Sequence, residues 1–271
     1  MWKLLLILVS VGFMLRPASA ADTAPMDYLV GINQSEYQFV QSDVLGRGFH
    51  IYVNLPEGYA SSTKAYPILY LLDGDYTYPM LASYYRYLKF AEEVPDIILV
   101  GIAYGADDFK GGNMRGADFT AKAETAAHYG GAPLFQQFFA QELFPLMEGK
   151  YRVNPDRRII FGQSLGGQFA LHAALTSPSL FWGHIASNPA LHRNLPFFLQ
   201  TSVPEGGMSK VFVSGSEQDD ARFKVPFLKW QKHWLGVEKK PWHFKTTILK
   251  GHNHFSAAPA AFRQGLLWLF E

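Results

Sequence analysis

A serine flanked by glycines, at the junction between an apolar run and a helix-forming segment, is the feature that most constrains the fold of this chain. The apolar run is Ile159-Ile160-Phe161, and Gly162-Gln163-Ser164-Leu165-Gly166 follows it directly. In the order strand, Gly-x-Ser-x-Gly, helix, such a motif forms a sharp turn that exposes the serine hydroxyl. Glycine is expected two positions either side of Ser164, where a side chain would collide with the strand or the helix. The alternative, a chance pentapeptide, is disfavoured by both flanks.

Apolar runs and helical patterns alternate along the rest of the chain, which predicts an α/β fold. Two segments in which polar and apolar residues alternate, 37–42 and 48–54, predict an antiparallel hairpin. The predicted buried strands are 66–72, 96–102, 159–161, 182–187, 210–214 and 243–249. The predicted helices are 80–93, 134–151, one after Ser164 that ends near Ser177, 227–235 and 258–270. Such alternation forms a mostly parallel sheet with helices on both faces and with the active site at the carboxyl ends of the strands.

Length and composition fit one globular domain. The chain has 271 residues, of which 48% are hydrophobic and 17% charged, and we expect a single domain over residues 21–271. The formal net charge of +1 gives no reason to expect a nucleic-acid partner or attraction to an acidic membrane surface. The chain contains no cysteine, so it has neither disulfides nor a lipid-attachment site. Nothing in the sequence indicates an oligomeric state.

Residues 1–20 have the pattern of a secretory signal peptide. Lys3 supplies a positive charge, residues 4–15 are apolar, and Ala18-Ser19-Ala20 is a small-residue cleavage site, so the predicted cut follows Ala20. The apolar segment is too short for a stable membrane span. The alternative is an uncleaved N-terminal anchor. We therefore expect a periplasmic or secreted protein without a stable membrane span.

A reactive serine needs a base and an orienting acid, which follow in the chain order serine, acid, histidine. Three carboxylates come after the predicted strand 210–214, namely Glu217, Asp219 and Asp220. We favour Asp219, because its distance past the strand end allows the loop to curl back toward the base. Glu217 is the second choice and Asp220 the third, and all three would be surface residues if the loop were only a turn.

The base is expected after the last predicted strand, where Gly251-His252-Asn253-His254 stands. We favour His254, which lies further into the loop and directly before the closing helix. His252 is the alternative. A zinc site built on this His-x-His pair is disfavoured, because the chain has no cysteine and its other histidines are scattered. We expect neither a metal nor a cofactor.

Two backbone amides are expected to stabilise an oxyanion. The amide of Leu165 stands at the start of the helix that follows Ser164. The second donor is expected in the turn after the first buried strand, at Gly74 or Asp75. Without the serine motif, the same turn would be read as an ordinary one.

Several motifs, in this order along nearly all of the mature chain, resemble the putative-esterase (esterase D-like) family of α/β-hydrolases. They are Ser42-Asp43-Val44-Leu45-Gly46-Arg47, Asn54-Leu55-Pro56-Glu57-Gly58-Tyr59, the run from Tyr66 to Gly74, Arg115, Asp118-Phe119-Thr120, Gly162 to Gly167 and His254-Phe255-Ser256. The chain is most similar to the periplasmic branch that includes siderophore-ester hydrolases. Gln163 departs from the family pattern, in which histidine is common, and the acid segment is not a clean match.

The resemblance implies a serine esterase with an α/β-hydrolase fold, in which Ser164 is the nucleophile and His254 the base. It also implies the oxyanion hole of Leu165 with Gly74 or Asp75. Because some siderophore esterases work as Ser-His dyads, the acid stays open. We expect hydrolysis of carboxylic esters through an acyl-serine intermediate, with Arg115 meeting anionic groups of a small-molecule ester. The alternatives are an acyltransferase or thioesterase with the same residues, and a binding protein that keeps the fold without catalysis.

Overall fold

The structure is a computed structural model, and it describes residues 29–202 and 209–271. The predicted signal peptide, residues 1–20, and its cut after Ala20 lie outside these residues. Within the described ranges, no helix has both the length and the apolar character that are needed to cross a membrane.

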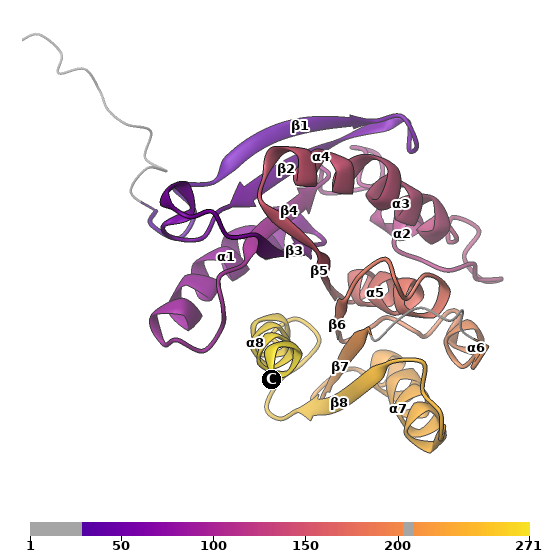
Figure 1. Cartoon of the computed structure of the whole chain (residues 1–271). Coiled ribbons are helices and arrows are strands. Elements are labelled where there is room, and N and C mark those ends of the chain that lie inside the picture. Colours follow the sequence, from indigo (N-terminus) through magenta and orange to yellow (C-terminus); the bar gives the residue numbers. More distant parts are fainter. Residues whose placement is uncertain (1–28, 203–208) are drawn as a thin grey trace, which may run out of the picture.

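Eight strands of the described chain form one central sheet (Figure 1). They are β1 (Glu36–Ser42), β2 (Arg47–Asn54), β3 (Tyr66–Leu71), β4 (Ile98–Ala103), β5 (Val153–Gln163), β6 (Gly183–Ser187), β7 (Lys210–Ser216) and β8 (His243–Leu249). Their order across the sheet is β1-β2-β4-β3-β5-β6-β7-β8. Strand β2 is antiparallel to β1 and to β4, whereas every other neighbouring pair is parallel. The predicted fold class, a mostly parallel α/β-hydrolase sheet with an N-terminal antiparallel hairpin, is confirmed.

Helices cover both faces of this sheet, as predicted (Figure 1). On one face lie α1 (Gly74–Phe90) and α8 (Ala258–Phe270). The other face is covered by α3 (Ala132–Phe138), a π-helical stretch (Phe139–Leu143), α4 (Phe144–Lys150), α5 (Leu165–Thr176), α6 (Leu195–Phe198) and α7 (Ala221–Gly236). Two further short helices, η2 (Tyr59–Ser61) and α2 (Arg115–Asp118), lie in connecting segments. The sequence pattern predicted the bounds of α8, but it placed the start of α1 at residue 80.

Helix α1 begins earlier than predicted because a tight turn and the helix start coincide. Asp73 has a left-handed backbone, with φ 54°, directly before the helix. Its carbonyl oxygen accepts hydrogen bonds from the amides of Tyr76 and Thr77, and the Thr77 hydroxyl donates to the carbonyl of Leu72 at 2.7 Å. Pro79 lies inside this helix. Because proline is disfavoured in a helix interior, the sequence pattern did not indicate a helix before residue 80.

A cluster of fully buried aromatic rings supports the strand that carries the serine motif. Phe139 contacts Phe135, Phe169 and Phe181, with ring centroids 5.3, 5.8 and 5.2 Å apart. Phe169 belongs to α5, so the helix that follows Ser164 is fixed against the sheet. Each buried aromatic ring contributes about 1.5–3 kcal/mol through the area that it removes from water.

A partly buried ion pair fixes the long segment between β4 and α3. The guanidinium of Arg47 donates to the carboxylate of Asp118, and the Tyr104 hydroxyl donates to the other oxygen of Asp118 at 2.7 Å. Burial raises the pKa of Asp118, while Tyr104 and Arg47 oppose this rise. Since Arg47 comes from the N-terminal hairpin, this pair ties the hairpin to the segment that borders the active-site edge.

Two buried histidines make the fold sensitive to acid. Burial lowers the pKa of His172 to about 4 and that of His184 to about 3. In the unfolded chain an imidazole titrates near pH 6.5. Below that pH the unfolded state therefore binds protons that the buried histidines of the folded state do not. The contribution of these two histidines to the free energy of unfolding is complete above pH ~6.5, and it is lost as the pH falls.

We expect His184→Leu to flatten the dependence of unfolding free energy on pH. The slope between pH ~6 and ~4 should decrease by about 1.4 kcal/mol per pH unit, which corresponds to one proton. Urea unfolding at a series of pH values measures this slope. His243→Leu is the matched control, because His243 is an exposed strand residue, and it should leave the slope unchanged. Equal slopes in wild type and His184→Leu would contradict the prediction.

Candidate active site

Ser164 occupies the turn between β5 and α5 with a strained backbone. Its φ of 58° and ψ of −111° lie in a region that residues other than glycine rarely adopt. The amide of Ser164 donates to the carbonyl of Ser187 at 2.9 Å, and its own carbonyl accepts from the amides of Gln168 and Ala190 at 2.9 and 3.0 Å. Partners from β6, α5 and the segment after β6 thus hold the serine in this conformation.

The glycines around Ser164 allow backbones to approach closely. A Cβ at Gly162 would lie 2.1 Å from the carbonyl carbon of Gly166, so no side chain fits there. A Cβ at Gly167 would lie 2.8 Å from the carbonyl oxygen of Ser187. At Gly166 the nearest contact would be 3.3 Å, to Leu72. The closest approaches are therefore at Gly162 and Gly167, rather than at the symmetric pair Gly162 and Gly166 that the sequence predicted.

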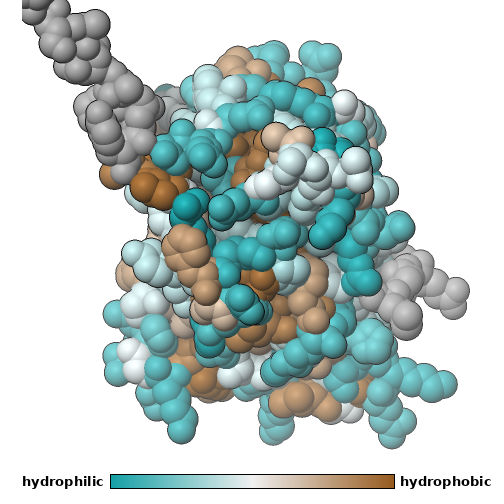
Figure 2. Space-filling view, turned by 60° about the vertical axis from the view of Figure 1, so that its left-hand side comes forward, coloured by the Kyte–Doolittle hydropathy of each residue, from teal (hydrophilic) through white to brown (hydrophobic). Residues whose placement is uncertain are grey.

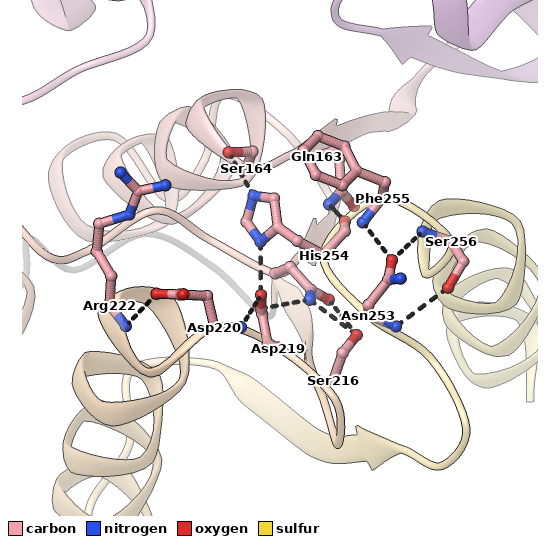
Figure 3. Close-up of polar contacts among 11 residues, drawn as sticks. Gln163, Ser164, Ser216, Asp219, Asp220, Arg222, Asn253, His254, Phe255 and Ser256 are labelled. Carbon is pink, nitrogen blue, oxygen red and sulfur yellow. Dashed lines mark hydrogen bonds and ion pairs between the residues drawn. The ribbon is translucent and has the colours of Figure 1, made fainter.

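Three predicted residues form one chain of polar contacts at the carboxyl ends of the strands (Figure 3). Nε2 of His254 is 2.8 Å from Oγ of Ser164, and Nδ1 is 3.1 Å from Oδ2 of Asp219. An ionised carboxylate only accepts hydrogen bonds, so Nδ1 carries the proton and Nε2 is free to accept one from the Ser164 hydroxyl. His254 is 7% exposed, and the Asp219 side chain is 3% exposed. The arrangement has the geometry that general-base activation of a hydroxyl requires.

One polar side chain and one backbone amide hold the Asp219 carboxylate in place. Asn188 Nδ2 donates to Asp219 Oδ2 and to Ser216 Oγ, both at 2.8 Å, and Ser216 Oγ donates back to Asn188 Oδ1 at 3.1 Å. The amide of Asp220 donates to the second oxygen of Asp219 at 3.0 Å. Asn188 has a positive φ of 43° directly after β6. The carboxylate is thus oriented by the ends of β6 and β7 together.

The competing acids and the competing histidine have other contacts. Glu217 accepts a hydrogen bond from the amide of Gly251 at 2.9 Å. Asp220 caps α7 by accepting from the amide of Arg222 at 2.8 Å. Nδ1 of His252 is 2.9 Å from the carbonyl oxygen of Ser256. Neither carboxylate has a contact with His254, so the geometry favours the first choices made from the sequence, whose catalytic roles stay predictions.

An aromatic ring packs on the imidazole of His254, and a hydrogen bond to its backbone carbonyl fixes the loop that carries it. The ring of Phe223 stacks on it with a centroid distance of 3.9 Å and an interplanar angle of 18°. The Gln163 side-chain amide donates to the carbonyl oxygen of His254 (Figure 3). The ring of His192 packs edge-on against Phe223. Burial and the nearby Arg193, Arg222 and His254 lower the pKa of His192. Gln163, the departure from the family pattern, therefore positions the histidine loop.

The two candidate positions for the second oxyanion donor differ in their surroundings. Asp75 lines the cavity beside Ser164, and its carboxylate accepts from the amides of Tyr104 and Gly105 at 3.3 and 3.2 Å. Gly74 packs against β4, where a Cβ would lie 2.6 Å from the amide nitrogen of Ile102. Leu165 is the first residue of α5, so its amide belongs to the positive end of that helix. The roles of Leu165, Gly74 and Asp75 stay predictions.

A cavity of about 470 Å³ opens beside Ser164 and His254. Arg115 lines it, but both Nε and Nη2 of this guanidinium donate to Asp73, at 2.6 and 2.9 Å. The expected charge of Arg115 is therefore balanced by a carboxylate in the same wall. Asp75 and the exposed Asp107 add further negative charge to the lining. Arg115 stays a predicted substrate-binding residue, with its remaining N–H groups available.

Few of the large aromatic side chains that follow or flank the strands line the cavity at Ser164. Tyr76, which is 68% exposed, lines the cavity. Trp230 is fully buried, and Trp182 lines another cavity at the opposite end of the strands with Lys210. Phe255, from the His254-Phe255-Ser256 motif, lines the cavity as well and is 88% exposed.

Residues that sequence reasoning missed support the site indirectly. Asn188, Ser216 and Phe223 were not predicted to act, although each lies at or just after the carboxyl end of a strand or in the first turn of the next helix. Their position at the carboxyl edge of the predicted sheet was the sequence signal that could have indicated them. In residues 29–202 and 209–271, no three His, Asp or Glu side chains are grouped as a metal site would require.

The sheet order and the serine turn at its edge define the chain as an α/β-hydrolase. A family model described as "Putative esterase" matches residues 42–258, and the chain belongs to this family. Membership confirms the class of enzyme predicted from the sequence, the carboxylic ester hydrolases.

Curated relatives and a solved structure agree with this assignment. Over 181 residues the chain is 31% identical to the ferri-bacillibactin esterase BesA of Bacillus subtilis. The match covers 61% of this chain and 62% of BesA, so it spans less than two thirds of the length of that protein. It is 28% identical over 249 residues to the apo-salmochelin esterase of Escherichia coli, covering 82% and 74%. An IroE-like serine hydrolase from Shewanella oneidensis superimposes with a TM-score of 0.75 at 23% identity, covering 88% and 80%, which shows the shared fold.

Proposed function

We propose that this protein hydrolyses carboxylic esters of the siderophore class through an acyl-Ser164 intermediate. The observation that carries the proposal is the contact chain from Ser164 Oγ through His254 to Asp219. Membership in the esterase family and the names of its siderophore-esterase relatives support the substrate class.

In the first half of the reaction, Ser164 Oγ attacks the ester carbonyl while Nε2 of His254 takes the hydroxyl proton. Asp219 keeps the proton of Nδ1 in place and stabilises the imidazolium that forms. The oxyanion of the tetrahedral intermediate is stabilised by the amides of Leu165 and of Gly74 or Asp75. One such donor typically contributes about 10²–10³ in rate, because it is oriented before charge develops.

In the second half, His254 returns its proton to the leaving alcohol, and the acyl group stays on Ser164. Water then enters, and its oxygen attacks the acyl carbon while His254 takes one of its protons. His254 returns this proton to Ser164 Oγ as the acyl-serine bond breaks, which releases the free acid. The Phe223 ring stacked on the imidazole supports this cycle, because it restricts the ring to one plane while the proton moves between the two oxygens.

The surroundings of Ser164 support a bulky, partly apolar ester. Phe255 and Tyr76 are exposed at the cavity, and Met80, which is 41% exposed, lines it as well. Because Asp73 balances the charge of Arg115, recognition of the ester relies on hydrogen bonds and apolar contact more than on net attraction of an anion.

We further propose that the protein acts in the periplasm or outside the cell, after cleavage behind Ala20. The pattern of residues 1–20 supports this. Expression of the full chain in a Gram-negative host, followed by fractionation and N-terminal sequencing, tests it. We expect a soluble periplasmic product that begins at Ala21. Recovery of a membrane-bound product that begins at Met1 would favour the uncleaved anchor.

Ser164→Ala tests the nucleophile. We expect kcat for p-nitrophenyl acetate to fall by about 10⁴-fold or more, because the variant lacks the hydroxyl that contacts Nε2 of His254. A fluorophosphonate should label wild type at Ser164 and leave the variant unlabelled. Iron-free and ferric bacillibactin and salmochelin, assayed for ester cleavage, test the substrate class.

Wild-type turnover with water as the acceptor separates the hydrolase from an acyltransferase, which would need an added alcohol or thiol. Full activity in Ser164→Ala would refute the proposed mechanism. Absence of both labelling and turnover in wild type would favour the non-catalytic binding protein.

Asp219→Asn, compared with Glu217→Gln and Asp220→Asn, tests the acid. We expect the first variant to lower kcat by roughly 10²–10⁴-fold, because an amide cannot keep Nδ1 protonated as a carboxylate does. The other two are matched changes on the same loop and should lower kcat less than about threefold, since these side chains lack contact with His254. Similar activity in all three variants would instead indicate a Ser-His dyad.

A further inference from the structure

The ring of Phe223, in the first turn of α7, contacts two groups that carry or acquire positive charge. The imidazole of His254 stacks on this ring with a centroid distance of 3.9 Å and an interplanar angle of 18°. The guanidinium of Arg222 also lies over the ring, with Cζ 4.4 Å from its centroid. One phenyl ring therefore contacts a group that is always cationic and a group that becomes cationic when it accepts a proton.

The stacked ring of Phe223 favours the charged form of the imidazole. The face of a phenyl ring carries partial negative charge, so it attracts a cation that lies within about 6 Å of the ring centroid. His254 experiences this attraction only as an imidazolium, the form that it takes once in each half of the proposed reaction. Because His254 is 7% exposed, little water competes with the ring for this charge.

The other charged and titratable groups around the imidazole act on it in different ways. Asp219 is hydrogen-bonded to Nδ1 and stabilises the imidazolium directly. His192 packs edge-on against the phenyl ring at 5.2 Å, and burial, followed by the nearby cations, lowers its pKa, so this second imidazole is neutral at pH 7. The exposed Arg193 donates to a backbone carbonyl. Arg222 is thus the cation that shares a ring with the imidazole.

Arg222 opposes the stabilisation that the ring provides. Its guanidinium competes with the imidazolium for the same π-electrons, and two cations on one ring repel each other. Salt weakens the effect of this exposed side chain, whereas the stacked contact between the phenyl ring and the imidazole is screened much less. The two residues therefore have opposite and separable effects on the charge of His254.

We propose that Phe223 acts through His254 as a positioning residue whose ring face stabilises the imidazolium during ester cleavage, and that Arg222, over the same ring, limits this stabilisation. The two residues together set the pH range in which His254 acts as a base. This inference rests on the proposed function, because the imidazolium forms only if His254 takes the proton of Ser164. The two contacts with one ring carry it.

The pH dependence of kcat/KM for p-nitrophenyl acetate tests the proposal with Phe223→Leu, which keeps an apolar side chain beside the imidazole but removes the ring face. Activity falls at low pH because a protonated imidazole cannot accept the serine proton. Since the variant stabilises the imidazolium less, the pH of half-maximal kcat/KM should decrease by roughly 0.3–0.7 unit. At the high-pH plateau, kcat should fall about twofold to fivefold, because the transition state carries the same charge. Phe223→Tyr, which keeps the ring, should behave like wild type.

Arg222→Gln should increase the pH of half-maximal kcat/KM, because a cation leaves the shared ring. Roughly 0.5 M NaCl should reduce this increase, but it should leave the decrease in Phe223→Leu in place. A ring that only restrains the imidazole would lower the activity of Phe223→Leu without changes of opposite sign in the two variants.

Phe90→Leu and Arg86→Gln are the matched controls, because Cζ of Arg86 also lies over a phenyl ring, 5.2 Å from the centroid of Phe90. Phe90 is the last residue of α1, is 64% exposed and does not line the cavity at Ser164. Helix α1 lies on the left of Figure 1, the side that Figure 2 turns forward, where apolar patches alternate with hydrophilic residues. Both control variants should keep the wild-type pH profile.

The proposal is overturned if Phe223→Leu leaves the pH of half-maximal kcat/KM unchanged, or if Phe223→Tyr changes it as much as Phe223→Leu does. Should Phe223→Leu not fold, Arg222→Gln at an exposed position decides, and the absence of an increase at low salt overturns the proposal. In all these cases, turnover by wild type leaves the esterase function in place. Absence of turnover in wild type would instead refute the esterase function itself, and this inference with it.

Discussion

The strained backbone of Ser164 is the constraint on which the rest of the site depends. A positive φ at a residue with a side chain costs roughly 1–3 kcal/mol, so it persists only where neighbouring contacts hold it. Here the carbonyl of Ser187 and the amides of Gln168 and Ala190 supply those contacts, and Gly162 lets the helix start pass close to the strand. The hydroxyl thereby projects from the sheet edge instead of packing into the core.

The remaining polar groups reach this hydroxyl because parallel strands end at one edge. Asn188 follows β6, Asp219 follows β7 and His254 follows β8, and their side chains are joined by hydrogen bonds across the strand ends (Figure 3). Each contact fixes the next, from Ser216 to Asn188, then to Asp219 and to the imidazole. The contact chain is thus a product of sheet order, and no single loop could form it alone.

The sequence pattern predicted those elements whose formation depends mainly on residues that are close together along the chain. The apolar runs gave the strands, the glycine-serine spacing gave the turn at Ser164, and the periodicity of residues 258–270 gave α8 with its observed bounds. The predicted start of α1 was wrong, because the left-handed Asp73 and the proline inside the helix, Pro79, both interrupt the helical pattern of the sequence.

Other features depend on distant pairings that a single sequence does not specify. Sequence could narrow the acid to three carboxylates, but only the fold brings Asp219 to Nδ1 of His254 while Glu217 accepts from Gly251. The stack of Phe223 on the imidazole and the pairing of Arg115 with Asp73 are of the same kind. Each joins residues whose proximity follows from the crossovers of the sheet.

The imidazole that meets Ser164 comes from a position 90 residues further along the chain. A nascent polypeptide that has completed β5 and α5 already contains the serine turn, but it lacks β8 and the loop that carries His254. Under the proposed mechanism, the hydroxyl therefore stays unactivated until His254, 90 residues later, has been synthesised. Under the same mechanism, activation requires β8 to join the edge of the sheet, because His254 lies in the loop that follows this strand.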